Sequence, residues 1–345
     1  MHAQIAPVLQ SILDEQPRDA EMMHRAVTAV MSGECGEAEI AALLTGLAID
    51  GERAEDVAGA ARAMRDHAAK IPTSRGGLID TCGTGGDRLH TFNISTAAAL
   101  VVAAVGVPVA KHGNRGVSSF SGSADVLEAL GVDIGLSARQ VGRCIDAIGI
   151  GFCFARVMHS AMKHVAPVRG ALGFRTIFNL LGPLTNPAGA EFQVIGANRV
   201  ATAQKLAEAI SRLGTSRTLV VCGADQLDEV SLWGETTVFD VKGGEVDEFT
   251  WTAADFGRKD CTVDAIQVDG PAESAEVISG VLSGQAGPAA DIVIVNSAAA
   301  LIAAGKCETP AAAAQLAEEA IASRRAERLL VDLAAWTQEA TEAEV

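Results

Sequence analysis

A glycine-rich turn between an apolar run and a long Ala/Val/Leu segment constrains the fold of this chain more than any other feature. Residues 80–96 read DTCGTGGDRLHTFNIST, after the apolar run 77–79 and before the segment 97–104. This order predicts a strand, a loop and a helix. The three glycines within 83–86 let backbone N–H groups approach a ligand, and the polar residues in 93–96 stand where a helix N-terminus would attract an anion. The loop therefore predicts a phosphate site.

The composition is that of a globular protein without a membrane or disulfide signature. The chain has 345 residues, 49% of them hydrophobic and 20% charged, which is enough for two domains with their own cores. No apolar run is long enough to cross a membrane, and the first residues carry no signal-peptide pattern. The seven cysteines are scattered without a Cys-x-x-Cys pair. We therefore expect a cytoplasmic protein with reduced thiols, no zinc site and no membrane contact.

The charge is strongly negative overall but locally positive. A net charge of −16 disfavours sequence-independent binding to nucleic acid, so we expect no nucleic-acid partner. Between residues 111 and 175, however, eight basic side chains face only four acidic ones. A cationic region in an acidic protein suits a small polyanionic substrate, although chance fluctuation is the alternative.

Hydrophobic periodicity divides the chain into a helical part and an alternating part. Apolar residues recur at helical spacing in four short segments between 5 and 70, and 71–77 has linker composition. Strand and helix patterns then alternate, which predicts an α/β fold with a mostly parallel sheet flanked by helices. The expected strands are 107–110, 193–196, 218–222 and 291–295, with a hairpin of 236–241 and 245–251 at the sheet edge. The expected helices are 123–130 (capped by Ser121 or Ser123), 201–213, 274–282, 296–304 and 310–322.

One segment interrupts this alternation. Residues 159–187 carry helix signals and several basic side chains, yet they lie between strand-rich halves. We infer that they leave the sheet and join the N-terminal helices. The smaller all-α domain is then discontinuous, formed by 1–72 with 159–187, and the α/β domain is formed by 73–158 with 188–345.

The glycine loop does not match two common phosphate-binding templates. Arg88 stands where a dinucleotide-binding loop has its last glycine, and no Gly-Lys-Ser/Thr ending of a Walker loop is present. Asp87 instead follows the glycines. A carboxylate near phosphates needs a metal ion or a ligand hydroxyl between them, and a ribose supplies hydroxyls.

Three further groups fit a phosphate and metal site, although each also has a simpler interpretation. Residues 111–119 (KHGNRGVSS) are rich in hydrogen-bond donors, but they could form an ordinary polar loop. Asp228 and Glu229 could bind a divalent ion, but an isolated acidic pair is more often simply solvated. Ser95 could be a Mg²⁺ ligand or a helix cap. His112, His159 and His164 could each be structural, so none is assigned as a general base.

Taken in order, these segments resemble the anthranilate phosphoribosyltransferases, over nearly the whole chain. The motifs that carry the resemblance are 80–87, 93–96, 111–115, 118–131, 161–169 (AMKHVAPVR), 175–187 and 228–231. Each motif is short, but together they are highly specific. Arg156 and Ser160 stand where the family often has proline.

The resemblance implies a reaction, a metal ion and a set of site residues. The reaction is transfer of the phosphoribosyl group from phosphoribosyl pyrophosphate to anthranilate, with Mg²⁺ required, in tryptophan biosynthesis. The family is usually a homodimer formed through the helical part. The residues implied to hold phosphoribosyl pyrophosphate are Gly83, Gly86, Asp87, Thr91, Asn93, Ile94, Ser95, Thr96, Lys111, His112, Gly113, Asn114, Arg115, Gly116, Val117, Ser118, Ser119 and Ser123. Those implied to contact anthranilate are Gly83, Asn114 and Arg169, and those implied to bind Mg²⁺ are Ser95, Asp228 and Glu229.

The physical chemistry of this reaction suits these residues. Loss of pyrophosphate leaves positive charge on the ribose and gathers negative charge on the leaving group, which Mg²⁺, Lys111 and Arg115 would stabilise. The aromatic amine of anthranilate is neutral, so the main task is to bring two reactants together. Two alternatives remain from the sequence: a nucleoside phosphorylase of the same fold, which would not need the acidic pair, and a non-catalytic nucleic-acid-binding relative.

Overall fold

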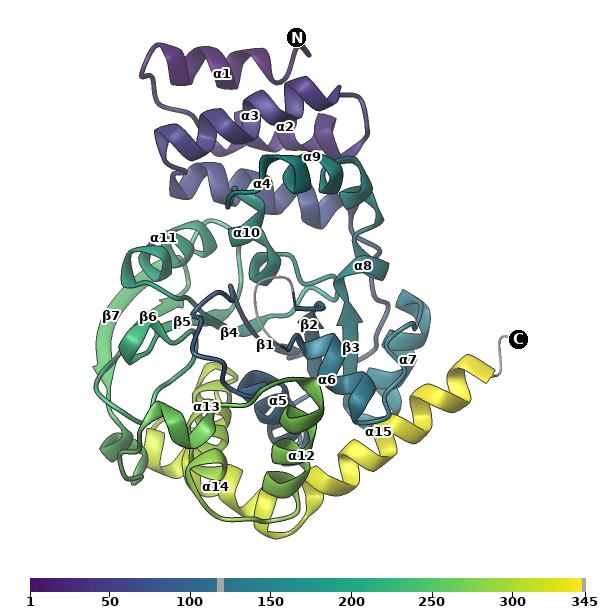
Figure 1. The fold of residues 1–345 in the computed structure, drawn as a ribbon, viewed down its shortest axis with the longest axis vertical. Helices are drawn as coiled ribbons and strands as arrows, with labels where there is room; N and C mark the ends of the chain where they lie inside the picture. The colour runs from purple at the N-terminus through teal and green to yellow at the C-terminus, as the bar shows by residue number, and fades with distance from the viewer. Residues whose placement is uncertain (117–120, 343–345) are drawn as a thin grey trace.

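The computed structural model describes residues 1–116 and 121–342. A layer of helices formed by the N-terminal residues stands above a sheet that is covered by helices on both faces (Figure 1). The N-terminus lies at the outer edge of the helical layer. The C-terminal helix, yellow in Figure 1, runs along the side of the sheet domain that is remote from this layer.

Four amphipathic helices form the N-terminal bundle, as the periodicity predicts. They are α1 (Ala6–Leu13), α2 (Ala20–Met31), α3 (Glu37–Asp50) and α4 (Ala54–His67). Asp19 caps α2 by accepting a hydrogen bond from the backbone N–H of Met22. The buried guanidinium of Arg18 binds the carboxylates of Asp50 and Asp56, which fixes the chain before α2 against α3 and α4.

A seven-stranded sheet forms the centre of the second domain. Its strands are β1 (Ile79–Gly83), β2 (Val109–Gly113), β3 (Ile150–Phe154), β4 (Phe192–Gly196), β5 (Arg217–Cys222), β6 (Thr236–Lys242) and β7 (Glu245–Trp251). Their order is β3-β2-β1-β4-β5-β6-β7, with β1 to β5 parallel and the β6–β7 hairpin antiparallel at the edge. The chain therefore adds strands on one side of β1 and then returns to add β4 on the other. In open parallel sheets, this reversal marks the place where ligands bind, at the carboxyl ends of the strands.

Alternate residues of the strands supply two cores. On β4, Val194 packs toward one face and Ile195 toward the other. The Val194 face is covered by α5 (Ile94–Val105), α12 (Pro271–Leu282), α13 (Pro288–Ala303), α14 (Pro310–Ala322) and α15 (Arg325–Glu342). The Ile195 face is covered by α7 (Ala138–Ile148) and α11 (Val200–Ile210). Helix α4 packs on α11, so the core of the bundle continues onto this face of the sheet.

The segment after β3 crosses to the N-terminal bundle. It forms α8 (Ala155–Met158), the 3-10 turn η1 (Ser160–His164), α9 (Ala166–Leu172), α10 (Phe178–Leu181) and the 3-10 turn η2 (Gly182–Leu184). α9 packs on α3, α10 on α4 and η1 on α2. These contacts support a discontinuous helical domain, while its exact bounds, 1–72 with 159–187, stay a prediction.

Two details of the expected fold are wrong and two elements were not expected. Residues 291–295 are not a strand but lie inside α13, which is buried on all sides and so lacks the polar stripe that marks a helix. The cap of α6 (Ser123–Ala129) is Gly122, not Ser121 or Ser123. α7 and the short strand β3 were missed. Within the described residues, no helix combines the length and the hydropathy that crossing a membrane requires.

Candidate active site

The carboxyl ends of β1 and β4 meet where the strand order reverses, and the loop that carries the acidic pair passes over them. Gly83 ends β1 and pairs in register with Gly196 at the end of β4. A Cβ atom on Gly83 would lie 2.3 Å from Oδ2 of Asp228, and one on Gly196 would lie 1.6 Å from the Asp228 carbonyl oxygen. Both strands must therefore end in glycine for this loop to rest on them.

The glycine loop is fixed by hydrogen bonds to the acidic loop, to the end of β4 and to the residues that follow β4. The N–H of Gly85 donates to Oδ2 of Asp228 at 2.7 Å, and the N–H of Thr84 donates to the carbonyl of Gly196 at 2.8 Å. Asn198, just after β4, donates from Nδ2 to the carbonyl of Gly86 at 2.9 Å. Gly85 and Gly86 have φ of 67° and 84°, which L side chains rarely adopt. Nothing in the sequence around Asn198 marks this residue as a contact of the glycine loop.

The acidic residues of the site lie close together and repel one another. The carboxylate of Glu229 accepts a hydrogen bond from the N–H of Ser95 at 3.0 Å, at the first turn of α5. Burial raises the pKa of Asp228, and the neighbouring Asp87 raises it further. Burial and the charge of Asp228 likewise raise the pKa of Glu229. Such a cluster gains stability from a cation, and oxygen ligands of this kind fit Mg²⁺.

This cluster does not form a complete metal cage. In the part of the chain that the structure describes, no group of three His, Cys, Asp or Glu side chains has the arrangement to hold a metal ion. Mg²⁺ characteristically binds through one or two carboxylates and completes its shell with water and substrate phosphates. The arrangement of Asp228 and Glu229 fits an ion that arrives with a phosphorylated substrate.

Lys111 places a buried positive charge beside these carboxylates. Its side chain comes from β2, is 3% exposed, and donates to the carbonyl of Thr81. Its Nζ also lies 3.5 Å from the hydroxyl of Ser95. The Lys111 charge opposes the rise in the pKa of Glu229. Lys111 therefore acts in this structure as a fixed charge within the site wall.

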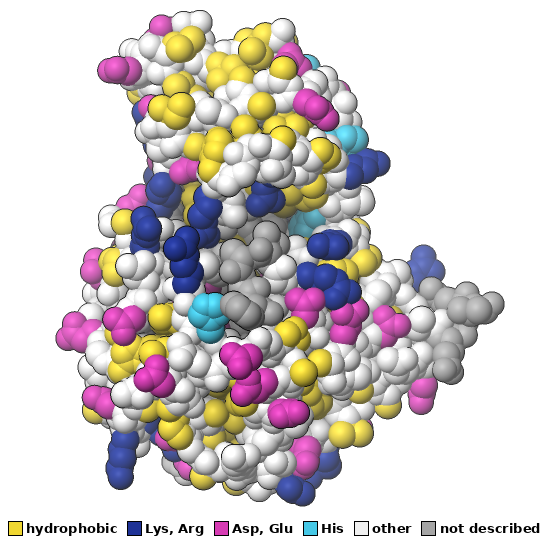
Figure 2. Space-filling view, in the orientation of Figure 1, with side chains coloured by type: hydrophobic (Ala, Val, Ile, Leu, Met, Phe, Trp, Pro, Cys, Tyr) yellow, Lys and Arg dark blue, Asp and Glu magenta, His cyan; other side chains and the backbone are white. Residues whose placement is uncertain are grey.

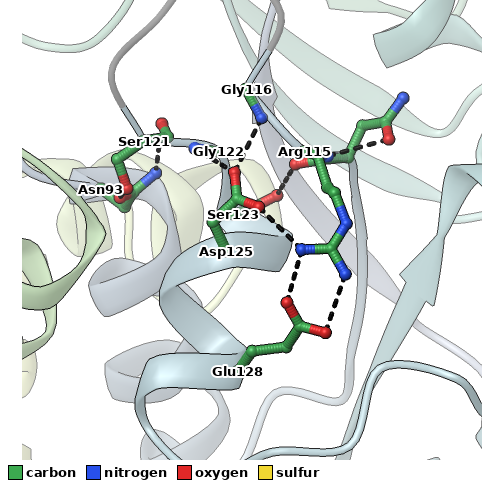
Figure 3. Close-up of polar contacts among 9 residues, drawn as sticks. Asn93, Arg115, Gly116, Ser121, Gly122, Ser123, Asp125 and Glu128 are labelled. Carbon is green, nitrogen blue, oxygen red and sulfur yellow. Dashed lines mark hydrogen bonds and ion pairs between the residues drawn. The ribbon is translucent and has the colours of Figure 1, made fainter.

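The Asn93 side chain joins three separate segments at the start of α5. Its Oδ1 accepts hydrogen bonds from the hydroxyls of Ser121, at 2.6 Å, and Ser274, at 2.8 Å. Its Nδ2 donates to the carbonyl of Ser121 at 3.2 Å (Figure 3). Asn93 therefore positions the loop around Ser121 and does not cap α5 with its side chain. Ser274 was not expected here, because it is distant in sequence and lies in an ordinary helix start.

Arg115 is held by two carboxylates of α6. Its guanidinium contacts Asp125 at 2.9 Å and forms a two-pronged pair with Glu128 (Figure 3). The other oxygen of Asp125 accepts the N–H groups of Gly116 and Gly122, at 2.9 and 3.1 Å. These contacts close the base of the loop between β2 and α6. Val117, Ser118 and Ser119 lie outside the described residues, so their predicted roles stay predictions.

Other predicted residues lie around the same loops. Ser123 begins α6, with its hydroxyl 3.4 Å from the carbonyl of Asn114, and a Cβ on Gly113 would collide with it. Thr91 forms an isolated backbone bridge with Gln267. Ile94 and Thr96 are buried in the first turn of α5.

Arg169 belongs to α9 and is supplied by the crossing segment. Its guanidinium carbon lies 5.7 Å from the centre of the Phe178 ring, and burial lowers its pKa. No described residue forms an ion pair with it. A partly buried, unpaired guanidinium next to an aromatic ring suits an aromatic carboxylate.

A buried histidine pair joins β2 to the crossing segment. The Nε2 atoms of His112 and His159 lie 3.2 Å apart, and Nδ1 of His112 lies 3.0 Å from the carbonyl of Gly182. Burial lowers the pKa of His112 to about 4 and that of His159 to about 3. Both imidazoles are therefore neutral near pH 7. Oδ1 of buried Asp80 accepts the backbone N–H of His112 at 2.9 Å, and Nδ2 of Asn186 donates to Oδ2 of Asp80 at 2.8 Å and to the carbonyl of Ala110 at 2.7 Å.

Basic side chains surround the place where the helical layer meets the sheet domain. In the face shown in Figure 2, Lys and Arg gather at this hollowed waist, whereas Asp and Glu predominate on the surface below it.

Comparison with known proteins identifies the class that this fold and site define. A model of the glycosyl transferase family, helical bundle domain, matches residues 6–68, and one of the glycosyl transferase family, a/b domain, matches residues 75–327. The second covers more than half of the chain, so the protein is a member of this glycosyl transferase family.

Individual relatives show which group within this glycosyl transferase family the chain belongs to. The chain is 45% identical over 339 residues to an anthranilate phosphoribosyltransferase of Thiobacillus denitrificans, covering 97% of this chain and 99% of that protein. It is 47% identical over 338 residues to that of Thioalkalivibrio sulfidiphilus, covering 98% of both. The chain belongs to the anthranilate phosphoribosyltransferases.

Solved structures agree with this assignment. The anthranilate phosphoribosyltransferase of Thermus thermophilus superposes with a TM-score of 0.90 at 44% identity, covering 96% of this chain and 99% of that one. The enzyme of Saccharomyces cerevisiae, in complex with phosphoribosyl pyrophosphate and Mg, superposes with a TM-score of 0.90 at 27% identity, covering 98% and 99%. A complex of the yeast enzyme with 4-fluoroanthranilate has a TM-score of 0.87 at 26% identity, covering 98% of both chains.

Proposed function

We propose that this protein transfers the phosphoribosyl group from phosphoribosyl pyrophosphate to anthranilate in tryptophan biosynthesis, releasing pyrophosphate and N-(5-phosphoribosyl)anthranilate. The observation that carries this proposal is the seating of the Asp228–Glu229 loop on Gly83 and Gly196. It brings two carboxylates, a glycine loop and buried Lys111 to one crevice at the reversal of the strand order. The 45% and 47% identical relatives support the same reaction.

The phosphoribosyl pyrophosphate would lie over the ends of β1 and β4. The glycine loop, the first turn of α5 and the loop after β2 would hold its phosphates. The residues proposed for this role are the phosphoribosyl pyrophosphate contacts given above, from Gly83 to Ser123. Ser95, Asp228 and Glu229 would hold Mg²⁺, which when bound neutralises charge on the departing pyrophosphate. Lys111 would add a fixed positive charge that needs no reorganisation during the reaction.

Anthranilate would approach from the side of the helical domain. Arg169 would pair with its carboxylate, with Asn114 and Gly83 near its reacting end. The acceptor nitrogen would attack the ribose carbon as the bond to pyrophosphate breaks, and the extra proton on that nitrogen would then pass to the released pyrophosphate or to water. No described residue has to act as a general base, because the aromatic amine is already neutral.

The proposed enzyme has two domains that move relative to each other, and it is a homodimer of this chain. We propose that 1–72 with 159–187 carries the acceptor, that 73–158 with 188–345 carries the donor, and that the two close on each other during turnover.

Leu13 and Ile49 are 76% and 82% exposed on the helical bundle. Large apolar side chains of this exposure support a homodimer through the bundle. Equilibrium sedimentation tests the proposed dimer. We expect the parent to be dimeric and Ile49→Asp to be shifted toward the monomer, and a monomeric parent would contradict the proposal.

A direct assay tests the proposed reaction. Anthranilate is fluorescent, and we expect its fluorescence to fall when enzyme, phosphoribosyl pyrophosphate and Mg²⁺ are combined, and to stay constant when any of the three is omitted. Stable fluorescence under all conditions, together with phosphorolysis of a nucleoside, would show that the protein is a nucleoside phosphorylase instead.

A further inference from the structure

A cavity lies at the junction of the helical bundle and the sheet domain, next to the proposed substrate site. Its volume is about 210 Å³, and it is walled by α3, α11 and the stretch that leads into α10. Its lining residues are Ala48, Glu52, Arg175, Thr176, Asn179, Leu180, Thr202 and Lys205. None of them belongs to the residues proposed above to bind phosphoribosyl pyrophosphate, anthranilate or Mg²⁺.

Two neutral donors of this cavity lack partners. Thr176 is 2% exposed, and its hydroxyl is buried without a hydrogen bond within the described residues. The backbone N–H of Thr176 donates to Oδ1 of Asn179 at 2.9 Å, which fixes the amide orientation. The NH₂ group of Asn179 then has no partner among the described residues. This hydroxyl has almost no accessible surface, so it lies directly behind the cavity wall that Thr176 helps to form. Buried polar groups are normally satisfied, and a rotation about the Cα–Cβ bond of Thr176 would turn the unpaired hydroxyl toward a bound ligand.

The charged groups of the cavity favour an anion. Arg175 is exposed, and no described residue forms an ion pair or hydrogen bond with it. Lys205 reaches Glu52 only at 3.8 Å, a long contact that leaves most of its donor capacity free. Thr202 lies in the first turn of α11, a helix of 11 residues whose N-cap, Arg199, provides no side-chain cap. The unpaired N–H groups of that turn add positive potential.

We propose that this cavity binds a small oxyanion, a carboxylate or a phosphate. Arg175 and Lys205 would balance its charge, and the hydroxyl of Thr176 and the amide of Asn179 would donate to its oxygens. Because α3 and α11 belong to different domains, the ligand would bridge them. Arg175 also borders the glycine loop, since a Cβ on Gly86 would lie 2.8 Å from its Nη1 atom. The proposal stands independently of the reaction proposed above.

Thr176→Val gives a sharp test, because it removes only the unpaired hydroxyl and preserves the side-chain shape. Dissociation constants for inorganic phosphate and for acetate would be obtained from thermal shifts at constant ionic strength. We expect the better of the two probes to bind about 3-fold more weakly to Thr176→Val and about 10-fold more weakly to Lys205→Gln. Without a probe, Thr176→Val should melt no lower than the parent, since no hydrogen bond is lost.

Two controls separate this cavity from other anion sites. Lys242→Gln removes an exposed lysine at the end of β6, which does not line the cavity, and should leave the dissociation constant unchanged. Arg115→Gln alters the proposed substrate loop and should leave the Thr176-sensitive binding in place. The probe that responds to the variants identifies the ligand as phosphate-like or carboxylate-like. If Thr176→Val and Lys205→Gln bind both probes as the parent does, the proposal is wrong, whatever the anthranilate assay shows.

Discussion

The backbone N–H of Gly85 donates a 2.7 Å hydrogen bond to the carboxylate of Asp228, a residue 143 positions further along the chain. This contact joins the glycine loop after β1 to the acidic loop after β5. Since the Asp228 backbone also rests on Gly196, the three carboxyl-terminal loops of neighbouring strands support one another. The loops that we propose to hold the donor are therefore connected by contacts within the chain, as the preorganised site of effective electrostatic catalysis requires.

Gly196→Ala should disrupt this assembly. The added methyl group would lie 1.6 Å from the Asp228 carbonyl oxygen, so the acidic loop must move. We expect kcat/KM to fall at least about 100-fold, which corresponds to roughly 2.7 kcal/mol of lost transition-state stabilisation. Gly76→Ala is the matched control, because its Cβ would meet only a Glu191 oxygen at 3.8 Å. Equal kinetics for the two variants would contradict the proposed seating of the loop.

Asp228→Asn combined with Glu229→Gln should change the metal dependence of the rate. The two carboxylates lose their charge but keep their shape, so the affinity for Mg²⁺ should fall while the fold persists. We expect the Mg²⁺ concentration for half-maximal activity to rise about 10-fold or more. Asp225→Asn, an exposed residue of the same loop region, serves as the control. An unchanged Mg²⁺ titration would remove the pair from the metal site.

Arg169→Ala should affect one substrate much more than the other. The guanidinium beside Phe178 would lose its proposed pairing with the anthranilate carboxylate, which is worth roughly 1.5–3 kcal/mol for a charged hydrogen bond. The KM for anthranilate should therefore rise about 10- to 100-fold, with little change in the KM for phosphoribosyl pyrophosphate. Arg156→Ala, an exposed arginine on α8, should change neither value. Equal rises in both KM values would refute the carboxylate role.

Glu128→Gln should improve the use of phosphoribosyl pyrophosphate. Arg115 is proposed to face the departing pyrophosphate but is paired with Glu128 and Asp125 in this structure. Exposed ion pairs contribute little to stability, so the fold should tolerate the change. With one competitor removed, we expect the KM for phosphoribosyl pyrophosphate to fall about 2- to 5-fold in steady-state assays. A higher KM would instead mean that the pair with Glu128 orders the loop.

The buried histidine pair should make the free energy of unfolding fall in mild acid. The folded-state pKa values of His112 and His159, about 4 and about 3, lie below the ordinary histidine value near 6.5. Below about pH 6.5 the unfolded chain therefore binds more protons than the folded one, and stability is lost as the pH falls. His159→Gln should reduce this slope by about 1.4 kcal/mol per pH unit between about pH 5.5 and 4.

Urea titrations at several pH values measure this slope. Above about pH 7.5 both imidazoles are neutral in the folded and the unfolded chain, so the parent and His159→Gln should show the same pH dependence there. Identical slopes in acid would mean that His159 is not buried as a neutral group.

Much of this architecture is predictable from the sequence because local signals agree with tertiary packing. The glycine loop, the bundle stripes and the hairpin at 236–251 each follow from periodicity and turn residues. The apolar run 291–295 predicts a strand, but it lies in helix α13, whose sides are all buried and which therefore has no polar stripe. Its length and the Pro288 at its first turn are signals that favour a helix. α7 also had a visible signal, a capping box formed by Ser137 and Gln140.

The candidate site was only partly predictable for a different reason. Motifs indicate which residues face a ligand, but they do not indicate which other residues hold these contact residues in position. Nothing local indicates that Ser274 would bind Asn93, or that Asp228 would rest on Gly196, since both contacts arise from the packing of distant segments. Likewise, Arg115 is a predicted phosphate contact in sequence, and only the structure shows that α6 already holds its charge.

The hydrogen bonds of Asn186 to Asp80 and Ala110 attach the crossing segment to the sheet in its buried core. The segment is also joined to β3 at its start, and between these two attachments it carries Arg169 on α9, which packs on α3 of the bundle. In the proposed closure, the position of Arg169 relative to the strand ends would therefore depend on both attachments to the sheet and on the packing against the bundle, and not on one hinge.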